Sequence, residues 1–208
     1  MTNTWIAGAT GLVGGALRKG LPEAIALARR PGPGLATVDY ARPESFAALP
    51  APQRLFIALG TTMAQAGSQA AFRAVDFDAV VAVARAARER GATHCGLVSA
   101  LGADARSGVF YNRVKGEAED ALIALGFERL VIARPSLLDG ERAALAQPRR
   151  AGEGWALRLT RPIAGLIPAR WRPITPDRVA RSLVLALDQP GPAVQVLESA
   201  QLQTLGAP

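Results

Sequence analysis

Cysteine and histidine are almost absent from this 208-residue chain, which contains one of each, Cys95 and His94. A single cysteine cannot form an internal disulfide. One cysteine and one histidine cannot by themselves supply the four ligands of a structural zinc site. The sequence therefore predicts no internal disulfide and no metal. Cys95 lies in an apolar stretch, so we expect it to be a small buried hydrophobic residue.

Long hydrophobic runs are also missing. No stretch approaches the ~18 uncharged apolar residues that a membrane-spanning helix needs, so we expect no membrane association. The first twenty residues have an apolar centre, but their charges, Arg18 and Lys19, come after it. A secretory signal peptide has its basic residues before the apolar segment. From these two absences we predict a cytoplasmic protein.

Lysine is scarce, although the chain is basic, with a formal net charge of +7 and 24 lysines and arginines together. All but Lys19 and Lys115 are arginine, and the arginines are scattered along the chain. A nucleic-acid-binding protein usually gathers its basic residues on one face. We therefore expect a generally basic surface that favours anionic small ligands, and no nucleic-acid partner.

Short apolar runs alternate regularly with helical patterns along the chain. Continuous apolar runs are typical of strands buried in a parallel sheet, and helices between them cover its two faces. The sequence therefore predicts the α/β class, with a doubly wound parallel sheet in one domain. Strands are predicted at 4–9, 24–28, 35–39, 54–59, 94–100, 129–135 and 193–199, and helices at 12–19, 69–90, 111–125 and 175–189.

The segment GATGLVG places three glycines at three-residue intervals between the first predicted strand and the first predicted helix. In a dinucleotide-binding turn, these glycines permit the tight turn, the approach of a pyrophosphate and the packing of the helix. Free amide groups at the helix start then attract the phosphates. The alternative is a packing turn without a ligand. We expect a nicotinamide dinucleotide to contact Gly8, Thr10, Gly11, Leu12, Val13 and Gly14.

Two arginines follow the second predicted strand, where an acidic residue would bind the ribose 2′-hydroxyl of NAD. Arg29 and Arg30 occupy this place. Guanidinium groups suit a 2′-phosphate, so we predict NADP(H); the alternative is that one or both arginines only solvate a loop. Asp39 ends the third predicted strand and is expected near the adenine edge. At the end of the fourth strand, the residues expected beside the cofactor ribose are Leu59, Gly60 and Thr61.

Tyr111 and Lys115 lie four residues apart on a predicted helix, so their side chains share one face. The chain has only two tyrosines. A free phenol has a pKa of ~10 and is a poor base at neutral pH, but a nearby ammonium lowers that pKa. Such a tyrosine can exchange a proton with a carbonyl or hydroxyl, while the lysine also reaches ribose hydroxyls. The alternative is an amphipathic helix with a surface lysine and a half-buried tyrosine.

These segments together resemble the short-chain dehydrogenase/reductase superfamily. The resemblance is strongest to its short atypical branch, and within that to the Tat-interacting-protein oxidoreductases and their bacterial relatives. It rests on GATGLVG, ALGTT, VSALGAD, YNRVKGEAE and ARPSLL, in this order, and covers nearly the whole chain. It implies an NADP(H)-binding Rossmann fold with Tyr111 as acid/base and Lys115 as its electrostatic partner. It also implies that Pro135, Ser136 and Leu137 lie beside the nicotinamide amide.

The domain organisation that we expect has three parts. Residues 1–136 form the cofactor-binding core, 137–175 a small substrate lobe, and 176–208 a closing helix and strand. The expected function is an NADP(H)-dependent oxidoreductase acting on a small carbonyl or alcohol. The alternative is an NADP(H)-binding sensor or interaction protein with little turnover.

Ser99 is the residue that separates these two functions, because it is the only hydroxyl in VSALGA, after the fifth predicted strand. The superfamily usually has a Ser or Thr there that holds the substrate oxygen. Ser99 either serves as that catalytic hydroxyl or only completes the strand. A Ser99 close to Tyr111 and facing an open pocket favours the enzyme, and a Ser99 buried in the sheet favours the sensor.

Overall fold

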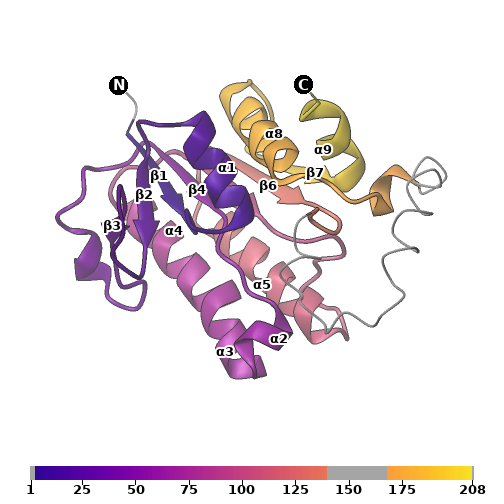
Figure 1. Cartoon of the computed structure of the whole chain (residues 1–208), viewed down its shortest axis with the longest axis horizontal. Coiled ribbons are helices and arrows are strands. Elements are labelled where there is room, and N and C mark those ends of the chain that lie inside the picture. Colours follow the sequence, from indigo (N-terminus) through magenta and orange to yellow (C-terminus); the bar gives the residue numbers. More distant parts are fainter. Residues whose placement is uncertain (1–2, 140–167, 208) are drawn as a thin grey trace.

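The computed structural model describes residues 3–139 and 168–207, and in these ranges seven strands form one parallel sheet (Figure 1). The strand order is β3-β2-β1-β4-β5-β6-β7, and every neighbouring pair is parallel. This confirms the predicted doubly wound α/β fold. The strands are β1 (Thr4–Ala7), β2 (Ile25–Ala28), β3 (Ala36–Thr37), β4 (Arg54–Ile57), β5 (His94–Val98), β6 (Arg129–Arg134) and β7 (Val194–Glu198).

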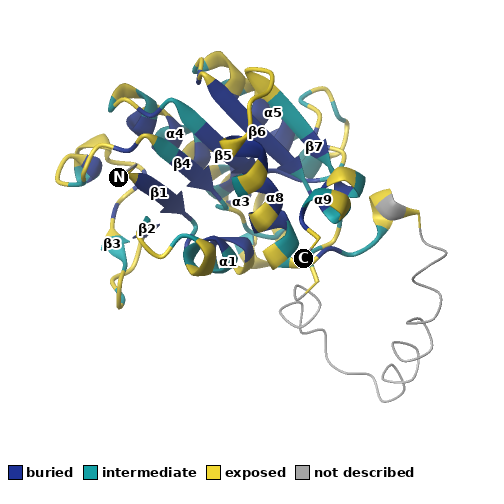
Figure 2. Cartoon of the chain, turned by 90° about the horizontal axis from the view of Figure 1, so that it is seen from above, coloured by how far each residue is buried: buried dark blue, intermediate teal, exposed yellow. Residues whose placement is uncertain are grey.

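Helices cover both faces of the sheet (Figures 1 and 2). Successive strand residues point to opposite faces, so each strand feeds two cores. In β1, Trp5 and Ala7 pack in one core and Ile6 in the other. The first core is closed by α4 (Ala79–Glu89) and α5 (Phe110–Ala124), and the second by α1 (Leu12–Gly20), α8 (Pro176–Asp188) and α9 (Ser199–Leu205). The inner strands β1, β2, β4, β5 and β6 are buried on both faces, which explains their continuous apolar runs.

The helix predicted over 69–90 is divided into three pieces. It consists of α3 (Gln69–Arg73), one π-helical turn (Ala74–Asp78) and α4. A π-helical turn inserts one extra residue while the apolar spacing on either side continues, so the pattern could not reveal it. Such turns often occur at functional sites. Here the wide turn carries Asp76, a buried carboxylate.

Other differences from the prediction are at the ends of elements. The third strand is only two residues long. The chain after the last strand forms α9, which was not predicted and which begins with a capping box between Glu198 and Gln201. A short helix, α2 (Met63–Ala66), and a 3₁₀ turn (Pro43–Phe46) were not predicted. Most of the predicted substrate lobe, 137–175, lies outside the described residues. No described helix is long and apolar enough to cross a bilayer.

The position of the ligand site follows from the strand order. The chain runs outward from β1 to β2 and β3, then returns to pair β4 on the other side of β1. The connections after β1 and after β4 therefore lead to helices on opposite faces of the sheet. They open a crevice beyond the carboxyl ends of these two strands, where ligands bind in sheets of this kind.

Candidate cofactor and active site

A cleft lies at the carboxyl end of the sheet and has two adjoining parts. The larger cavity has a volume of about 730 Å³ and the smaller one about 180 Å³. The two share Gly11, Ala58, Leu59 and Gly60, which follow or flank β1 and β4. The cleft therefore runs across the point where strand order reverses. An elongated ligand such as a dinucleotide fits this shape, with one half in each cavity.

The glycine turn forms the floor of the cleft. Gly8 has φ +82°, which favours glycine, and a Cβ there would lie 2.4 Å from the Ala58 carbonyl oxygen. A Cβ on Gly14 would lie 2.0 Å from the Gly8 carbonyl oxygen, so this glycine permits the close packing of α1. Gly11 differs, since its Cβ would only touch the same oxygen at 3.4 Å. Protein packing alone therefore does not require glycine at position 11, which borders both cavities.

The start of α1 is open to an anion. Gly11 is its N-cap and makes no side-chain cap, and the first turn contains no acidic residue. The amide groups at this end therefore have no side-chain acceptor and face the cleft with the positive end of the helix dipole. These features fit the pyrophosphate of a dinucleotide, as the sequence predicts. Gly14 is the one predicted turn residue that does not line the cleft, because it lies beneath the turn.

The larger cavity contains one of the two predicted arginines. Both arginines are exposed, but only Arg29 lines the cavity. Asp39 also lines it, with its carboxylate accepting a hydrogen bond from the Ala41 amide at 3.0 Å. Sequence reasoning missed three further charged residues that line this cavity, Asp78 of the π-helical turn and Arg85 and Glu89 of α4. Only the four-residue spacing of Arg85 and Glu89, which places them on one face of α4, could have indicated that they border the cavity.

Tyr40 forms part of the wall of the larger cavity and packs against Phe46. It is 5% exposed. Burial raises the pKa of the Tyr40 hydroxyl to about 12, against smaller opposite effects of the Gly8 backbone and of Arg29. The phenol therefore stays protonated at neutral pH. It is a neutral residue beneath the glycine turn, and its titration reports on the packing there.

The smaller cavity brings together the predicted catalytic residues. Tyr111 and Lys115 face it from α5, and Ser99 faces it from the end of β5. Leu137 is 39% exposed and does not line the cavity, and Leu138 lies there in its place. The other predicted cofactor residues that line this cavity are the shared Gly11, Leu59 and Gly60, together with Leu12, Val13, Thr61, Pro135 and Ser136.

Lys115 has a partner that the sequence did not indicate. Its Nζ lies 2.7 Å from Oδ1 of Asp76, and both side chains are almost fully buried. The other oxygen, Oδ2, accepts a hydrogen bond from the Thr61 amide at 2.9 Å. One signal was available: Asp76 lies four residues from Phe72 and from Val80, on what should be an apolar helix face. A carboxylate on such a face must be paired.

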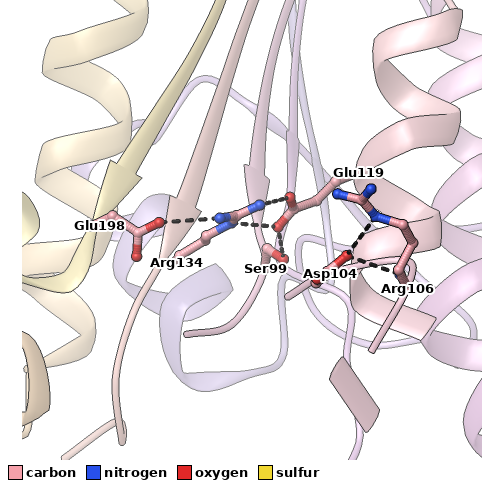
Figure 3. Close-up of polar contacts among 6 residues, drawn as sticks. All are labelled: Ser99, Asp104, Arg106, Glu119, Arg134 and Glu198. Atoms are coloured by element: carbon pink, nitrogen blue, oxygen red, sulfur yellow. Dashed lines mark hydrogen bonds and ion pairs between the residues drawn. The ribbon is translucent and has the colours of Figure 1, made fainter. Parts of the chain in front are cut away.

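Ser99 belongs to a chain of charged groups at the carboxyl ends of β5, β6 and β7 (Figure 3). The Ser99 hydroxyl donates to the Glu119 carboxylate. Arg134 donates to the two oxygens of Glu119 at 3.1 and 2.5 Å, and to Glu198 at 3.1 Å. Hydrogen bonding to Glu119 raises the pKa of the Arg134 guanidinium further. The network joins α5 to three strands and holds the Ser99 side chain in place.

This hydrogen bond restricts what Ser99 can do. A hydroxyl has one hydrogen, and that of Ser99 is directed at Glu119, although the residue lines the smaller cavity. In this arrangement Ser99 can accept a hydrogen bond from a ligand but cannot donate one. It is also 6% exposed. Ser99 thus combines a feature expected of the enzyme, its place beside Tyr111 in the cavity, with one expected of the sensor, its burial.

Ser136 is held by contacts outside the cleft. Its hydroxyl donates to the Arg172 carbonyl oxygen at 2.5 Å and accepts from the Ser199 hydroxyl at 3.0 Å. These bonds fix the segment after β6 that borders the smaller cavity.

Across residues 3–139 and 168–207, no three His, Cys, Asp or Glu side chains are grouped so that they could hold a metal ion.

Two curated relatives align with much or nearly all of the chain. "Protein FMP52, mitochondrial" of Eremothecium gossypii is 36% identical, over 98% of this chain and 96% of that protein. The protein of the same name from Coccidioides immitis is 37% identical, over 74% of this chain and 71% of that protein. No model of a protein family matches the sequence. These names give a compartment but no reaction.

Solved structures share the fold at low sequence identity. A UDP-N-acetylglucosamine 4-epimerase from Bacillus cereus has a TM-score of 0.69 and 15% identity, over 95% of this chain and 79% of that one. A dTDP-4-dehydrorhamnose reductase from Bacillus anthracis in complex with NADP has a TM-score of 0.66 and 14% identity, over 95% of this chain and 75% of that one. The enzyme WbmH of Bordetella bronchiseptica in complex with NAD⁺ has a TM-score of 0.65 and 16% identity, over 96% of this chain and 76% of that one. The Rossmann fold is thus shared with enzymes that bind NAD or NADP.

The prediction of a cytoplasmic protein is wrong in the light of these relatives, which are named as mitochondrial proteins. The physical reason is simple. That prediction rested on two absences, of a secretory signal and of a membrane-spanning run. Neither absence distinguishes one membrane-enclosed aqueous compartment from another.

Proposed function

This chain belongs to the FMP52 family, and we propose that it is an NADP(H)-dependent oxidoreductase acting on a small carbonyl or alcohol. The observation that carries the proposal is the shared cavity of Tyr111, Lys115 and Ser99 beside the glycine turn. The motif order also supports the finer relation to the Tat-interacting-protein oxidoreductases of the atypical short-chain branch.

Each half of the cofactor has a matching part of the cleft. The uncapped start of α1 suits the pyrophosphate, and Arg29 in the larger cavity suits a 2′-phosphate. No carboxylate follows β2, where one would bind the 2′-hydroxyl of NAD, and this favours NADP(H). The smaller cavity then takes the nicotinamide, beside Pro135 and Ser136.

The chemistry of this chain is proton transfer, since the bound cofactor supplies or accepts the hydride. In reduction, Tyr111 donates its phenolic proton to the carbonyl oxygen, and in oxidation it takes the proton of the alcohol. Lys115, one helical turn further along α5, stabilises the phenolate. Ser99 accepts a hydrogen bond from a substrate hydroxyl, because its own hydrogen is bonded to Glu119.

A panel of carbonyl compounds, with NADPH oxidation followed by absorbance, tests the proposal. Tyr111→Phe keeps the aromatic ring, whose centroid lies 5.3 Å from that of the Phe72 ring, so cofactor binding should remain. Loss of the acid/base group should reduce turnover by about 10²- to 10⁴-fold. Turnover that is unaffected by this change would exclude Tyr111 as the acid/base.

One observation favours a second function, an NADP(H)-binding sensor with little turnover. The hydrogen of the Ser99 hydroxyl is bonded to a buried carboxylate, so this hydroxyl cannot polarise a carbonyl. The two functions give different results in the same assay. A sensor binds NADPH but oxidises it no faster with the carbonyl panel than without.

A further inference from the structure

A buried carboxylate that no motif assigns lies under the smaller cavity. Asp76 is located in the π-helical turn between α3 and α4, and its side chain is fully buried. The extra residue of such a turn changes the direction of the side chains around it. A carboxylate removed from water in this way is costly unless charged or polar partners surround it.

Asp76 has such partners on both of its oxygens. Oδ1 is paired with Lys115 Nζ at 2.7 Å, and Oδ2 accepts the Thr61 amide at 2.9 Å. The Lys115 side chain is 8% exposed, so solvent screens this pair very little. The turn after β4, the wide turn and α5 are therefore joined at a single carboxylate.

The pair lies at the cleft and not in the scaffold behind it. Asp76 and Lys115 both line the smaller cavity together with Tyr111. Gly60, which borders both cavities, covers the pair closely: a Cβ there would lie 3.4 Å from Asp76 Oδ1 and 3.6 Å from Lys115 Nζ. Any ligand that passes over Gly60 passes next to this ion pair.

The titratable and charged groups near Lys115 come from α5 and three neighbouring elements. On α5, Tyr111 precedes it by one turn and Glu119 follows it by one turn. Glu119 is neutralised by Arg134 of β6, and Glu117 by Arg73 of α3. From the wide turn, Asp76 faces Lys115 directly. Asp76 is thus the carboxylate that neutralises the Lys115 ammonium.

We propose that Asp76 is a positioning residue that holds the Lys115 ammonium in the smaller cavity and offsets part of its effect on the Tyr111 hydroxyl. An unpaired ammonium would favour the phenolate strongly, whereas an ammonium paired with a carboxylate favours it less. Asp76 therefore sets the pH at which Tyr111 loses its proton. The consequence for catalysis rests on the proposed function, but the coupling of the three side chains does not.

The coupling can be measured without cofactor or substrate, because the chain has only two tyrosines, Tyr40 and Tyr111. In a Tyr40→Phe background, the ultraviolet absorbance of the phenolate reports Tyr111 alone. Asp76→Asn removes the charge but keeps an oxygen for the Thr61 amide. We expect it to move the Tyr111 titration midpoint to lower pH by about one unit. Asp78→Asn is the matched control, an exposed carboxylate in the same turn, and should leave the midpoint unchanged.

An unchanged or higher midpoint in a folded Asp76→Asn variant would overturn the proposal. Should that variant not fold, as judged by circular dichroism, Asp76→Ser gives the same test with a smaller neutral acceptor. Lys115→Gln should move the midpoint to higher pH, and a midpoint that stays in place would also contradict the coupling. None of these outcomes depends on NADPH binding, so failure here and failure of the proposed function are separate results.

Discussion

Glu119 offers the sharpest test of the buried network that holds Ser99. Its side chain is 4% exposed and its carboxylate accepts hydrogen bonds from Ser99 and Arg134. Glu119→Ala leaves the Arg134 guanidinium with Glu198 alone and the Ser99 hydroxyl without its acceptor. Removing one member of a buried pair costs about 3–5 kcal/mol. Because Arg134 is 24% exposed and keeps its bond to Glu198, we expect the free energy of unfolding to fall by about 3 kcal/mol.

Glu117→Ala is the matched control, on the same helix and with the same atoms removed. Its partner Arg73 is 42% exposed and Glu117 itself 29%, so loss of this pair should cost less than about 1 kcal/mol. The free energy of unfolding is measured by urea titration with circular dichroism. Equal losses in the two variants would refute the view that burial makes the Glu119 network strong.

Two further predictions concern the glycine turn and the tyrosine beneath it. Gly14→Ala should destabilise the protein by about 2 kcal/mol or more, because its Cβ would meet the Gly8 carbonyl oxygen at 2.0 Å. Gly15→Ala, whose Cβ meets nothing within 4 Å, should stabilise α1 by about 0.5–1 kcal/mol, and urea titration compares the two. Burial raises the pKa of Tyr40 to about 12 from 10.0, so its contribution to stability is complete below pH 10 and is lost as pH rises towards 12. In that window the free energy of unfolding should fall by up to about 1.4 kcal/mol per pH unit more in wild type than in Tyr40→Phe, and equal slopes would contradict this.

The parts of the site that could be predicted are those whose residues lie close together in the sequence. The glycine turn and the Tyr111–Lys115 pair each span a few residues, and the spacing of these residues along the chain determines how they lie in the fold. Strand positions were equally local, since burial on both faces gives continuous apolar runs. The α/β fold and most of the cleft follow from these local signals.

The missed parts depend on contacts between distant segments. Asp76 and Lys115 are far apart in the chain and meet only because α5 packs against the wide turn. The Ser99–Glu119 bond likewise needs β5 and α5 to be in place. Arg29 and Arg30 are equivalent in sequence, and only the direction of the chain after β2 decides that Arg29 lines the cleft.

That difference between neighbouring arginines allows the most direct test of the central claim, an NADP(H) cleft at the carboxyl end of the sheet. The measurement is titration of the protein with NADPH and with NADH, followed by nicotinamide fluorescence, for wild type, Arg29→Ala and Arg30→Ala. Loss of hydrogen bonds to a charged 2′-phosphate costs about 1.5–3 kcal/mol, or roughly 10- to 150-fold in Kd. We expect wild type to bind NADPH more tightly than NADH, Arg29→Ala to lose this preference, and Arg30→Ala to keep it. Absence of binding by either nucleotide would contradict the account, and the glycine turn would then be a packing feature alone.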